Sequence, residues 1–232
     1  MDNEKKSMIK DALILFAITL VAGLLLGFVY DVTKEPIAQQ KAKAKAEACK
    51  NVFAEAETFE AVRSRKVDFV TGTGDVLVFN AFIMREDGST EYLATDMYTE
   101  DNVDIDEVIR AFDSSGQLLG YVITVTDHEG YGGDIQFSMG VTLDGTLNGI
   151  SLLSISETAG LGMKAGDVLV PQFANKKVDS FTYTKSGSTS DSEIDAISGA
   201  TITTKAVVNG VNSGLLFFND ELAEIEGGGI NE

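Results

Sequence analysis

The most prominent feature in the pattern of apolar and polar positions along this chain is one long uninterrupted apolar run near its beginning. Residues 12–30 include no charged side chain. At a helical rise of ~1.5 Å per residue, this run covers about 28 Å, which is enough to cross the hydrocarbon core of a bilayer. It is too long for a secretory signal, and no Ala-x-Ala-like cleavage site directly follows it. We therefore predict a retained transmembrane helix over 12–30, preceded by a short N-terminal tail over 1–11.

Residues 31–60 change to a mixture rich in Ala, Lys and Glu, which favours a helical connector leaving the membrane. Its lysines have two interpretations that stay open: contact with anionic lipid headgroups, or a solvated helix face. Gly23 and Gly27 are either a small-xxx-small face that packs on a partner's helix or a chance pair. Cys49 is expected to be a small, half-buried packing residue, because nothing beside it in the sequence would activate its thiol.

From Val67 onward, short β-branched and apolar runs alternate with turn residues, and this pattern predicts strands. Val76–Phe82 is one such run, and it lies between turn signals at Thr71–Asp75 and at Asp87 and Gly88. Residues 102–112 alternate acids with Val and Ile, so they are compatible with either a helix or a strand.

Two later stretches, 113–126 and 144–156, share one plan. Each starts with a turn that contains Asp and Gly, continues through Leu and Gly, and ends in a β-branched strand. They predict two β-hairpins. The polar segment 186–192 predicts a flexible loop, and the apolar-periodic run over 203–218 predicts a last helix before a frayed tail over 223–232.

Charge is distributed unevenly along the chain, whose formal net charge is −18. Residues 1–50 hold eight lysines and six acids, whereas residues 51–232 hold 10 basic and 30 acidic residues. So acidic a domain argues against nucleic acid as a partner. A single cysteine and a single histidine cannot build a disulfide, a zinc finger or a Cys-ligated iron–sulfur cluster, and they argue against a haem His/Met pair of the usual kind. Any electrons that pass through the chain must therefore be carried by a bound organic cofactor, and no metal site is expected.

The stretch Asp195–Thr201 holds the most informative chemistry. Ser198 is a good N-cap residue, which would make Gly199, Ala200 and Thr201 the first turn of the last helix. Free backbone N–H groups and the positive end of the helix dipole would then surround Thr201. Because the two preceding residues are small, a phosphate group could approach closely.

The same stretch resembles the flavinylation signature Asp-x-x-Ser/Thr-Gly-Ala-Thr, in which the last threonine carries FMN through a phosphoester bond. Gly130–Ile135 matches a Gly-Tyr-Gly-Gly-x-Ile pattern of the FMN-binding family. Ser156–Gly162 resembles the Glu-Thr-Pro-Gly-Leu-Gly loop of that family, with Ala159 where proline is usual, which should loosen the loop slightly. On these motifs the chain resembles the G subunit of the Rnf complex, a membrane-bound ferredoxin:NAD⁺ oxidoreductase that moves ions.

The resemblance covers most of residues 10–220 and implies an α+β fold, in which a single transmembrane helix precedes an FMN-binding domain with antiparallel hairpins over 61–222. It implies covalent FMN on Thr201, so that the chain is a flavoprotein and a phosphoprotein. A threonine hydroxyl is a poor nucleophile without a base, and the only histidine is the distant His128. Thr201 is therefore expected to be the substrate of a separate flavin transferase that takes FMN from FAD with Mg²⁺, and no catalytic residue is expected.

Further roles follow from the resemblance, and each has a plainer alternative. Asp195 presents the hydroxyl or binds the transferase, or else caps a turn, while Ser198, Gly199 and Ala200 shape the turn. Thr203 and Thr204 donate hydrogen bonds to the phosphate or simply begin the helix. The cofactor-side residues of the other two motifs are Glu157, Thr158, Gly160, Leu161 and Tyr131.

In that group, Glu157 and Thr158 are expected to hydrogen-bond polar edges of the flavin, and Leu161 is expected to pack on its face. The alternative for this loop is a plain helix-start turn. Tyr131 offers an aromatic face to the flavin or belongs to the core. Lys176 and Lys177 either meet phosphate or an anionic reduced flavin, or are surface lysines. His128 is expected to be an exposed loop residue.

The implied function is electron transfer through FMN inside an Rnf complex, with the A, B, C, D and E subunits and membrane lipid as partners. No Gly-x-Gly-x-x-Gly follows a predicted strand, and the span has no charged residue, so neither NAD binding nor the ion path is expected here. The family places the flavin domain on the outer face of the cell membrane, although lysine counts around the span mildly favour the cytoplasm. Two alternatives stay open: the C subunit of the Na⁺-translocating NADH:quinone reductase, which is usually longer, and a membrane-tethered scaffold whose Thr201 is never modified.

Overall fold

A computed structural model describes residues 2–67, 78–84, 90–92 and 102–223, and the chain divides into two compact units, Met1–Ala44 and Lys45–Glu232. The first unit belongs to helix α1 (Asp2–Val52), which continues through Pro36. Every side chain from residue 7 to residue 44 is exposed, including the whole apolar run. Within the described part of the chain, one helix segment, Ser7–Val52, is long and apolar enough to cross a membrane.

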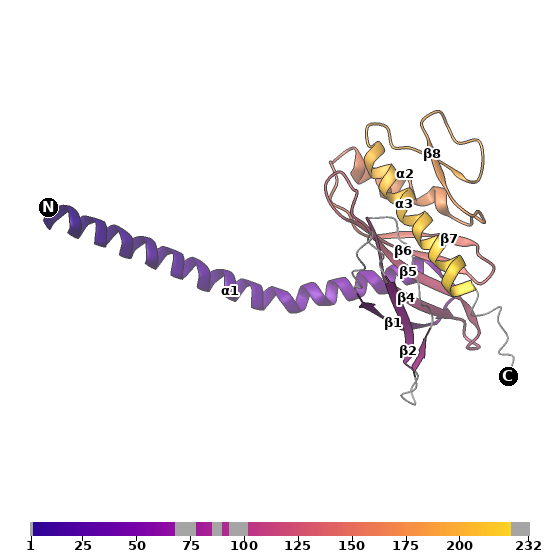
Figure 1. Cartoon of the computed structure of the whole chain (residues 1–232), viewed down its shortest axis with the longest axis horizontal. Coiled ribbons are helices and arrows are strands. Elements are labelled where there is room, and N and C mark those ends of the chain that lie inside the picture. The colour runs from indigo at the N-terminus through magenta and orange to yellow at the C-terminus, as the bar shows by residue number, and fades with distance from the viewer. Residues whose placement is uncertain (1, 68–77, 85–89, 93–101, 224–232) are drawn as a thin grey trace. The chain divides into compact units, whose positions relative to one another are not determined.

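The second unit is built on one antiparallel sheet of seven strands in the order β3-β2-β1-β4-β5-β6-β7 (Figure 1). Its strands are β1 (Thr58–Val67), β2 (Val78–Met84), β3 (Thr90–Tyr92), β4 (Val103–Phe112), β5 (Leu118–Asp127), β6 (Ile135–Thr142) and β7 (Leu147–Ser154). The stretch that was compatible with helix or strand is therefore strand β4, and residues 78–82 of the predicted run Val76–Phe82 lie in β2. The turn signals at 71–75 and 87–88 and the tail from residue 224 lie outside the described residues.

The two predicted hairpins are confirmed as β4–β5 and β6–β7. In the first turn, Asp113 Oδ1 accepts hydrogen bonds from the backbone N–H groups of Ser115 and Gln117, at 2.8 and 2.9 Å. In the second, Asp144 Oδ1 accepts from the Thr142 hydroxyl and from the Thr146 N–H. Each turn is closed by one aspartate, which explains why the two stretches look alike in sequence.

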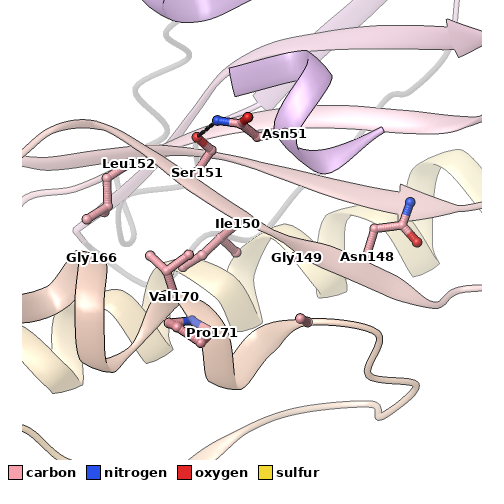
Figure 2. Close-up of a pocket in the computed structure, with 10 residues that line it drawn as sticks. Asn51, Asn148, Gly149, Ile150, Ser151, Leu152, Gly166, Val170 and Pro171 are labelled. Carbon is pink, nitrogen blue, oxygen red and sulfur yellow. Dashed lines mark hydrogen bonds between the residues drawn. The ribbon is translucent and has the colours of Figure 1, made fainter. Parts of the chain in front are cut away.

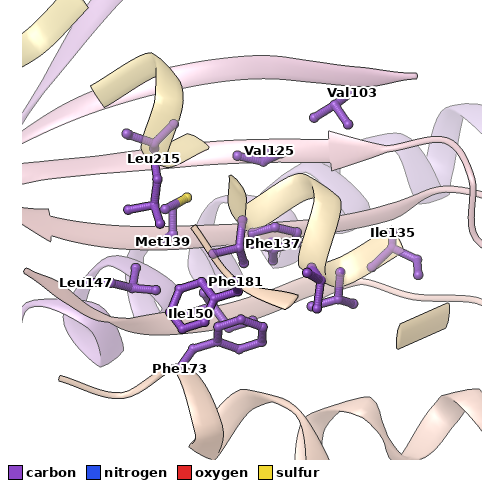
Figure 3. Close-up of a cluster of buried hydrophobic side chains, with 14 of the residues drawn as sticks. Val103, Val125, Ile135, Phe137, Met139, Leu147, Ile150, Phe173, Phe181 and Leu215 are labelled. Atoms are coloured by element: carbon purple, nitrogen blue, oxygen red, sulfur yellow. The ribbon is translucent and has the colours of Figure 1, made fainter. Parts of the chain in front are cut away.

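The last helix, α3 (Thr201–Phe217), lies against one face of the sheet and continues into a π turn (Phe218–Leu222) (Figure 1). Its apolar side chains pack with those of β4, β5 and β6 in the main core, part of which is shown in Figure 3. Gly210 and Gly214 allow the close approach: a Cβ at Gly210 would lie 2.9 Å from the Phe137 ring, and one at Gly214 would collide with Met139. The antiparallel sheet with its packed helix confirms the predicted α+β class.

The other face of the sheet is covered by the end of α1. Cys49, Val52 and Phe53 are buried there in a smaller cluster, together with residues of β4 and β5. Burial raises the pKa of the Cys49 thiol, so this cysteine packs as expected, and more completely than half-buried. The second unit thus starts within α1, at Lys45, and includes the last turns of the helix that the sequence assigned to the connector.

The segment between β7 and α3 packs against β7, which is an edge strand of the sheet. It contains η1 (Gly162–Lys164), α2 (Ala165–Val168), η2 (Val170–Phe173) and a short parallel pair, β8 (Thr182–Thr184) and β9 (Glu193–Asp195). The predicted loop over 186–192 joins β8 to β9. Its backbone is tied to β9, because Glu193 accepts a 2.7 Å bond from the Thr189 N–H and Asp195 accepts a 2.5 Å bond from the Ser188 N–H.

Candidate functional site

A cavity of about 500 Å³, the Thr201 pocket, opens where three loops meet: the loop between β5 and β6, the segment after β7, and the start of α3. Its volume lies within the range of small-molecule sites, about 300–1,000 Å³. It is lined by Tyr131, Glu157, Thr158, Leu161, Gly162, Gly199, Ala200, Thr201, Ile202 and Thr203. Three motifs that are far apart in the sequence therefore form one continuous site.

Helix α3 begins at Thr201, and the predicted N-cap at Ser198 is wrong. The N-cap is Ala200, whose side chain makes no capping bond, and Ser198 is exposed. The reason is the left-handed backbone of Gly199, with φ +79°, which turns the chain so that helical geometry starts two residues later. The helix itself then closes this turn through Thr204.

Thr201 is thus the first helical residue, half-buried, at the wall of the pocket. No N-cap side chain competes for the amide N–H groups of the first turn. Those groups and the positive end of the helix dipole favour a negatively charged ligand group. The start of α3 therefore has no capping side chain, and a different turn from the predicted one forms it.

Glu157 holds the walls of the pocket together. Its Oε1 accepts a 3.2 Å hydrogen bond from the Gly132 N–H. A Cβ at Gly130 would lie 3.0 Å from that same oxygen, and a Cβ at Gly162 would lie 2.8 Å from Oε2 and 2.6 Å from Thr203 Oγ1. The glycines of both motifs therefore make room for a carboxylate and a threonine of the protein itself.

Three apolar side chains of the pocket are left exposed. The exposed fractions are 70% for Tyr131, 51% for Ile202 and 40% for Leu161. The core interpretation of Tyr131 is thus wrong: its ring stands at the pocket and not among the buried side chains. Exposed apolar surface around a concave site suits a flat, apolar ligand ring.

Four residues predicted to belong to the site do not line the pocket: Asp195, Ser198, Gly160 and Thr204. The Asp195 carboxylate ties the 186–192 loop, and its backbone N–H donates to Gln172 Oε1 at 2.7 Å, so it secures a turn. Gly160 has φ +78° and shapes the turn before η1. Two lining residues were missed, Gly162 and Ile202, although each stands directly inside or beside a recognised motif.

Two family models match parts of this chain. Residues 130–216 match the family model of the FMN-binding domain, and residues 1–52 match that of the RnfG N-terminal region. Over 217 residues the chain is 30% identical to the G subunit of the Na(+)-translocating ferredoxin:NAD(+) oxidoreductase complex of Acetobacterium woodii, covering 93% of each chain. The chain belongs to the family of Rnf complex G subunits. All residues that line the Thr201 pocket fall within the FMN-binding match.

Further relatives show the same relationship. The G subunit of the ion-translocating oxidoreductase complex of Methanosarcina acetivorans is 28% identical over 91% of this chain and 94% of that one. The G subunit of the proton-translocating ferredoxin:NAD(+) oxidoreductase complex of Clostridium ljungdahlii is 40% identical over 44% of this chain and 54% of that one. Among solved structures, the chain is similar to NqrC of Shewanella oneidensis, with a TM-score of 0.48 and 17% identity over 77% of this chain and 88% of that one.

The two lysines considered as partners of a phosphate or flavin do not line the pocket. Lys176 pairs with Asp191, and Lys177 lies 3.1 Å from Asp144 in the β6–β7 turn. The surface interpretation of both is therefore the one that the structure favours. Lys205 is instead the cation one turn beyond Thr201, and its Nζ lies 3.1 Å from Glu129 Oε2.

His128 is an exposed loop residue, as predicted, but it is not isolated. Its ring nitrogens lie 2.9 Å from Asp134 Oδ1 and 3.2 Å from Asp104 Oδ2. These hydrogen bonds, that to Asp134 first, raise the pKa of the imidazole. With both nitrogens directed at carboxylates, His128 is not placed to act as a base for Thr201.

Asp127, the last residue of β5, is a buried carboxyl that no sequence motif indicates. Its Oδ1 accepts a 2.7 Å hydrogen bond from the Glu129 N–H, and its Oδ2 is buried without a partner among the described residues. Burial raises the pKa of this carboxyl to about 6. Only its position at the end of an apolar run could have indicated that its side chain is buried.

A second cavity, of about 400 Å³, lies beside β7, between the end of α1 and the η2 segment (Figure 2). Asn51 donates a 3.3 Å hydrogen bond to Ser151 across its rim. No titratable side chain is among its lining residues, and none of the predicted site residues lies there. The candidate site is therefore the Thr201 pocket.

Proposed function

We propose that this chain is the electron-transfer G subunit of an Rnf-type ion-translocating oxidoreductase complex, and that it relays electrons through FMN esterified to Thr201. The observation that carries the proposal is the position of Thr201: a hydroxyl residue at the uncapped start of α3, in a pocket that lies wholly within the FMN-binding match. Bound FMN supplies the redox chemistry, and the protein supplies position and electrostatics.

The residues of the pocket fit such a group. The first-turn amides of α3 suit its phosphate. Exposed Tyr131, Leu161 and Ile202 suit the apolar faces of its ring, and Thr158 is available to hydrogen-bond its polar atoms. Glu157 is held by Gly132, so its main role is to keep the walls together. The negative charge of the domain disfavours an anionic reduced flavin. This lowers the reduction potential of the bound flavin.

Attachment requires another enzyme. No histidine lines the Thr201 pocket, and His128 is engaged with two aspartates. A flavin transferase using FAD and Mg²⁺ supplies the missing base: the Thr201 oxygen bonds to the FMN phosphorus, the pyrophosphate bond of FAD breaks, AMP leaves, and the hydroxyl proton passes to the transferase. The product is a phosphothreonine diester.

In the complex, the chain works beside the A, B, C, D and E subunits, anchored as a single-pass protein by the apolar helix within Ser7–Val52. The exposure of every apolar side chain in residues 12–30 is what contact with lipid requires. The flavin domain lies on the outer face, where a covalent bond keeps a cofactor that no free FMN pool would replace. NAD binding and ion movement belong to the partner subunits.

The decisive experiment is to express the full chain with and without a flavin transferase and to weigh the Thr201 peptide. We expect a mass gain of FMN minus water only with the transferase, lost in Thr201→Ala. Thr182→Ala, which removes an exposed threonine outside the pocket, is the matched control and should keep the gain. An unmodified Thr201 peptide from native membranes would contradict the proposal and favour a scaffold.

A further inference from the structure

We propose that Glu129 is a positioning residue for the flavin: its carboxylate holds the Tyr131 loop (residues 128–134) against α3, and so keeps the Tyr131 ring at the pocket that contains Thr201. This inference rests on the proposed function for its flavin readout. Glu129 precedes the residues matched by the FMN-binding model, which begin at Gly130.

The contacts of Glu129 reach two other parts of the fold. Oε2 accepts hydrogen bonds from Lys205 Nζ at 3.1 Å and from Asn209 Nδ2 at 3.4 Å, on successive turns of α3. Oε1 accepts from Asn102 Nδ2 at 3.4 Å, just before β4. One carboxylate therefore joins the loop to the helix that carries Thr201 and to the sheet.

The rest of the loop is fixed to other elements, not to α3. The His128 N–H donates to the Asn102 carbonyl at 2.9 Å, and the Glu129 N–H donates to the buried Asp127. Gly132 is bound by Glu157. Between these attachments Tyr131 has a 70% exposed ring, so little packing holds that ring in place. The Glu129 contacts with Lys205 and Asn209 are the hydrogen bonds described between this loop and α3.

The contact between Glu129 and Lys205 is an ion pair, so its strength depends on the salt concentration. Lys205 lowers the pKa of Glu129, and Glu129 raises the pKa of Lys205, so both groups are charged at neutral pH. The side chain of Glu129 is 35% exposed and that of Lys205 is 51% exposed, so salt screens the pair. The contact therefore contributes little to the global stability of the domain, so its loss should be seen in the loop rather than in overall unfolding.

The test compares the full chain, produced with a flavin transferase, in five forms: wild type, Glu129→Gln, Lys205→Gln, Lys205→Arg and Lys177→Gln. The last variant breaks the exposed pair with Asp144, which is the same kind of contact away from the pocket. Three quantities are measured: the mass of the Thr201 peptide, the circular dichroism of the flavin absorption bands, and hydrogen exchange of the Tyr131 loop.

We expect FMN mass in all five forms, because Thr201 itself is untouched. Glu129→Gln and Lys205→Gln should weaken the flavin dichroism and speed hydrogen exchange in the loop, while Lys205→Arg and Lys177→Gln should match wild type. High salt should shift the wild-type flavin dichroism toward that of Glu129→Gln and leave Glu129→Gln unchanged.

The two proposals fail in different ways. Without FMN mass in the wild type the proposed function is wrong, and hydrogen exchange alone then decides the positioning role. Loop exchange in Glu129→Gln equal to that in wild type overturns the inference whether or not flavin is bound. Unchanged dichroism in a flavinylated Glu129→Gln chain overturns it as well.

Discussion

The Thr204 hydroxyl accepts a 3.1 Å hydrogen bond from the backbone N–H of Ile197, and it donates a 3.0 Å bond to the Ala200 carbonyl. Thr204 is fully buried, so this pair has no access to water. Thr204, a residue inside α3, therefore stabilises the turn that precedes Thr201. The sequence predicted that a capping side chain before the helix, that of Ser198, would have this role.

Thr204→Val keeps the shape of the side chain and removes the hydroxyl. The buried Ile197 N–H would lose its partner, which should cost about 1–3 kcal/mol of unfolding free energy. Flavin attachment at Thr201 should fall as well, because the turn before it loosens. Urea unfolding and the mass of the Thr201 peptide measure the two effects. Thr204→Ser keeps the hydroxyl and is the control; equal behaviour of the Val and Ser variants would count against this role.

Gly162→Ala tests the contact between the pocket walls. The new Cβ would lie 2.6 Å from Thr203 Oγ1 and 2.7 Å from Glu157 Cβ, so one wall must move, at a cost of about 1–3 kcal/mol. We expect a lower thermal midpoint and less flavin attached. Gly166→Ala is matched, because its Cβ would meet only Leu152 at 3.8 Å. A Gly162→Ala chain as stable as Gly166→Ala would show that the walls can separate freely.

Asp127 predicts a pH dependence at acidic pH. Its pKa is raised from 3.8 to about 6 in the folded chain, so between these values the folded state binds more protons than the unfolded state. The contribution of Asp127 to stability should therefore fall as pH rises from 3.8 to about 6, by on the order of 3 kcal/mol, and remain lower above that. Asp127→Asn should flatten this slope in unfolding experiments at a series of pH values. An unaltered slope would mean that the carboxyl is not the titrating group.

His128 predicts a second dependence, at higher pH. The pKa of its imidazole is raised above 6.5 in the folded chain, chiefly by Asp134, so its contribution is complete below pH 6.5 and lost as pH rises through the folded value. His128→Gln should remove this loss from the thermal midpoint, measured between about pH 6 and 9. Asp134→Asn, which removes the nearer carboxylate, should reduce it in the same direction. A wild-type midpoint that stays flat over this range would contradict the assignment.

The sequence predicted both hairpins, the last helix and the three loops that meet at the pocket, because these carry local patterns, whereas it missed β1, whose first residues it assigned to the helical connector. Hairpins show in the Asp and Gly turns, and the pocket loops carry recognisable strings around Tyr131, Glu157 and Thr201. Ser198 was assigned wrongly because an N-cap depends on the backbone dihedral angles around it, which a residue type does not specify. Contacts such as Glu129 to Lys205, 76 residues apart, leave no local pattern at all.

Gly210 and Gly214 let α3 pack closely on Phe137 and Met139, because a Cβ at either position would lie 2.9 Å or less from those side chains. An ester formed at Thr201 would consequently be attached to a helix that packs closely on the sheet. Displacing such an ester relative to the sheet would then require either a change in this packing or a movement of the whole domain.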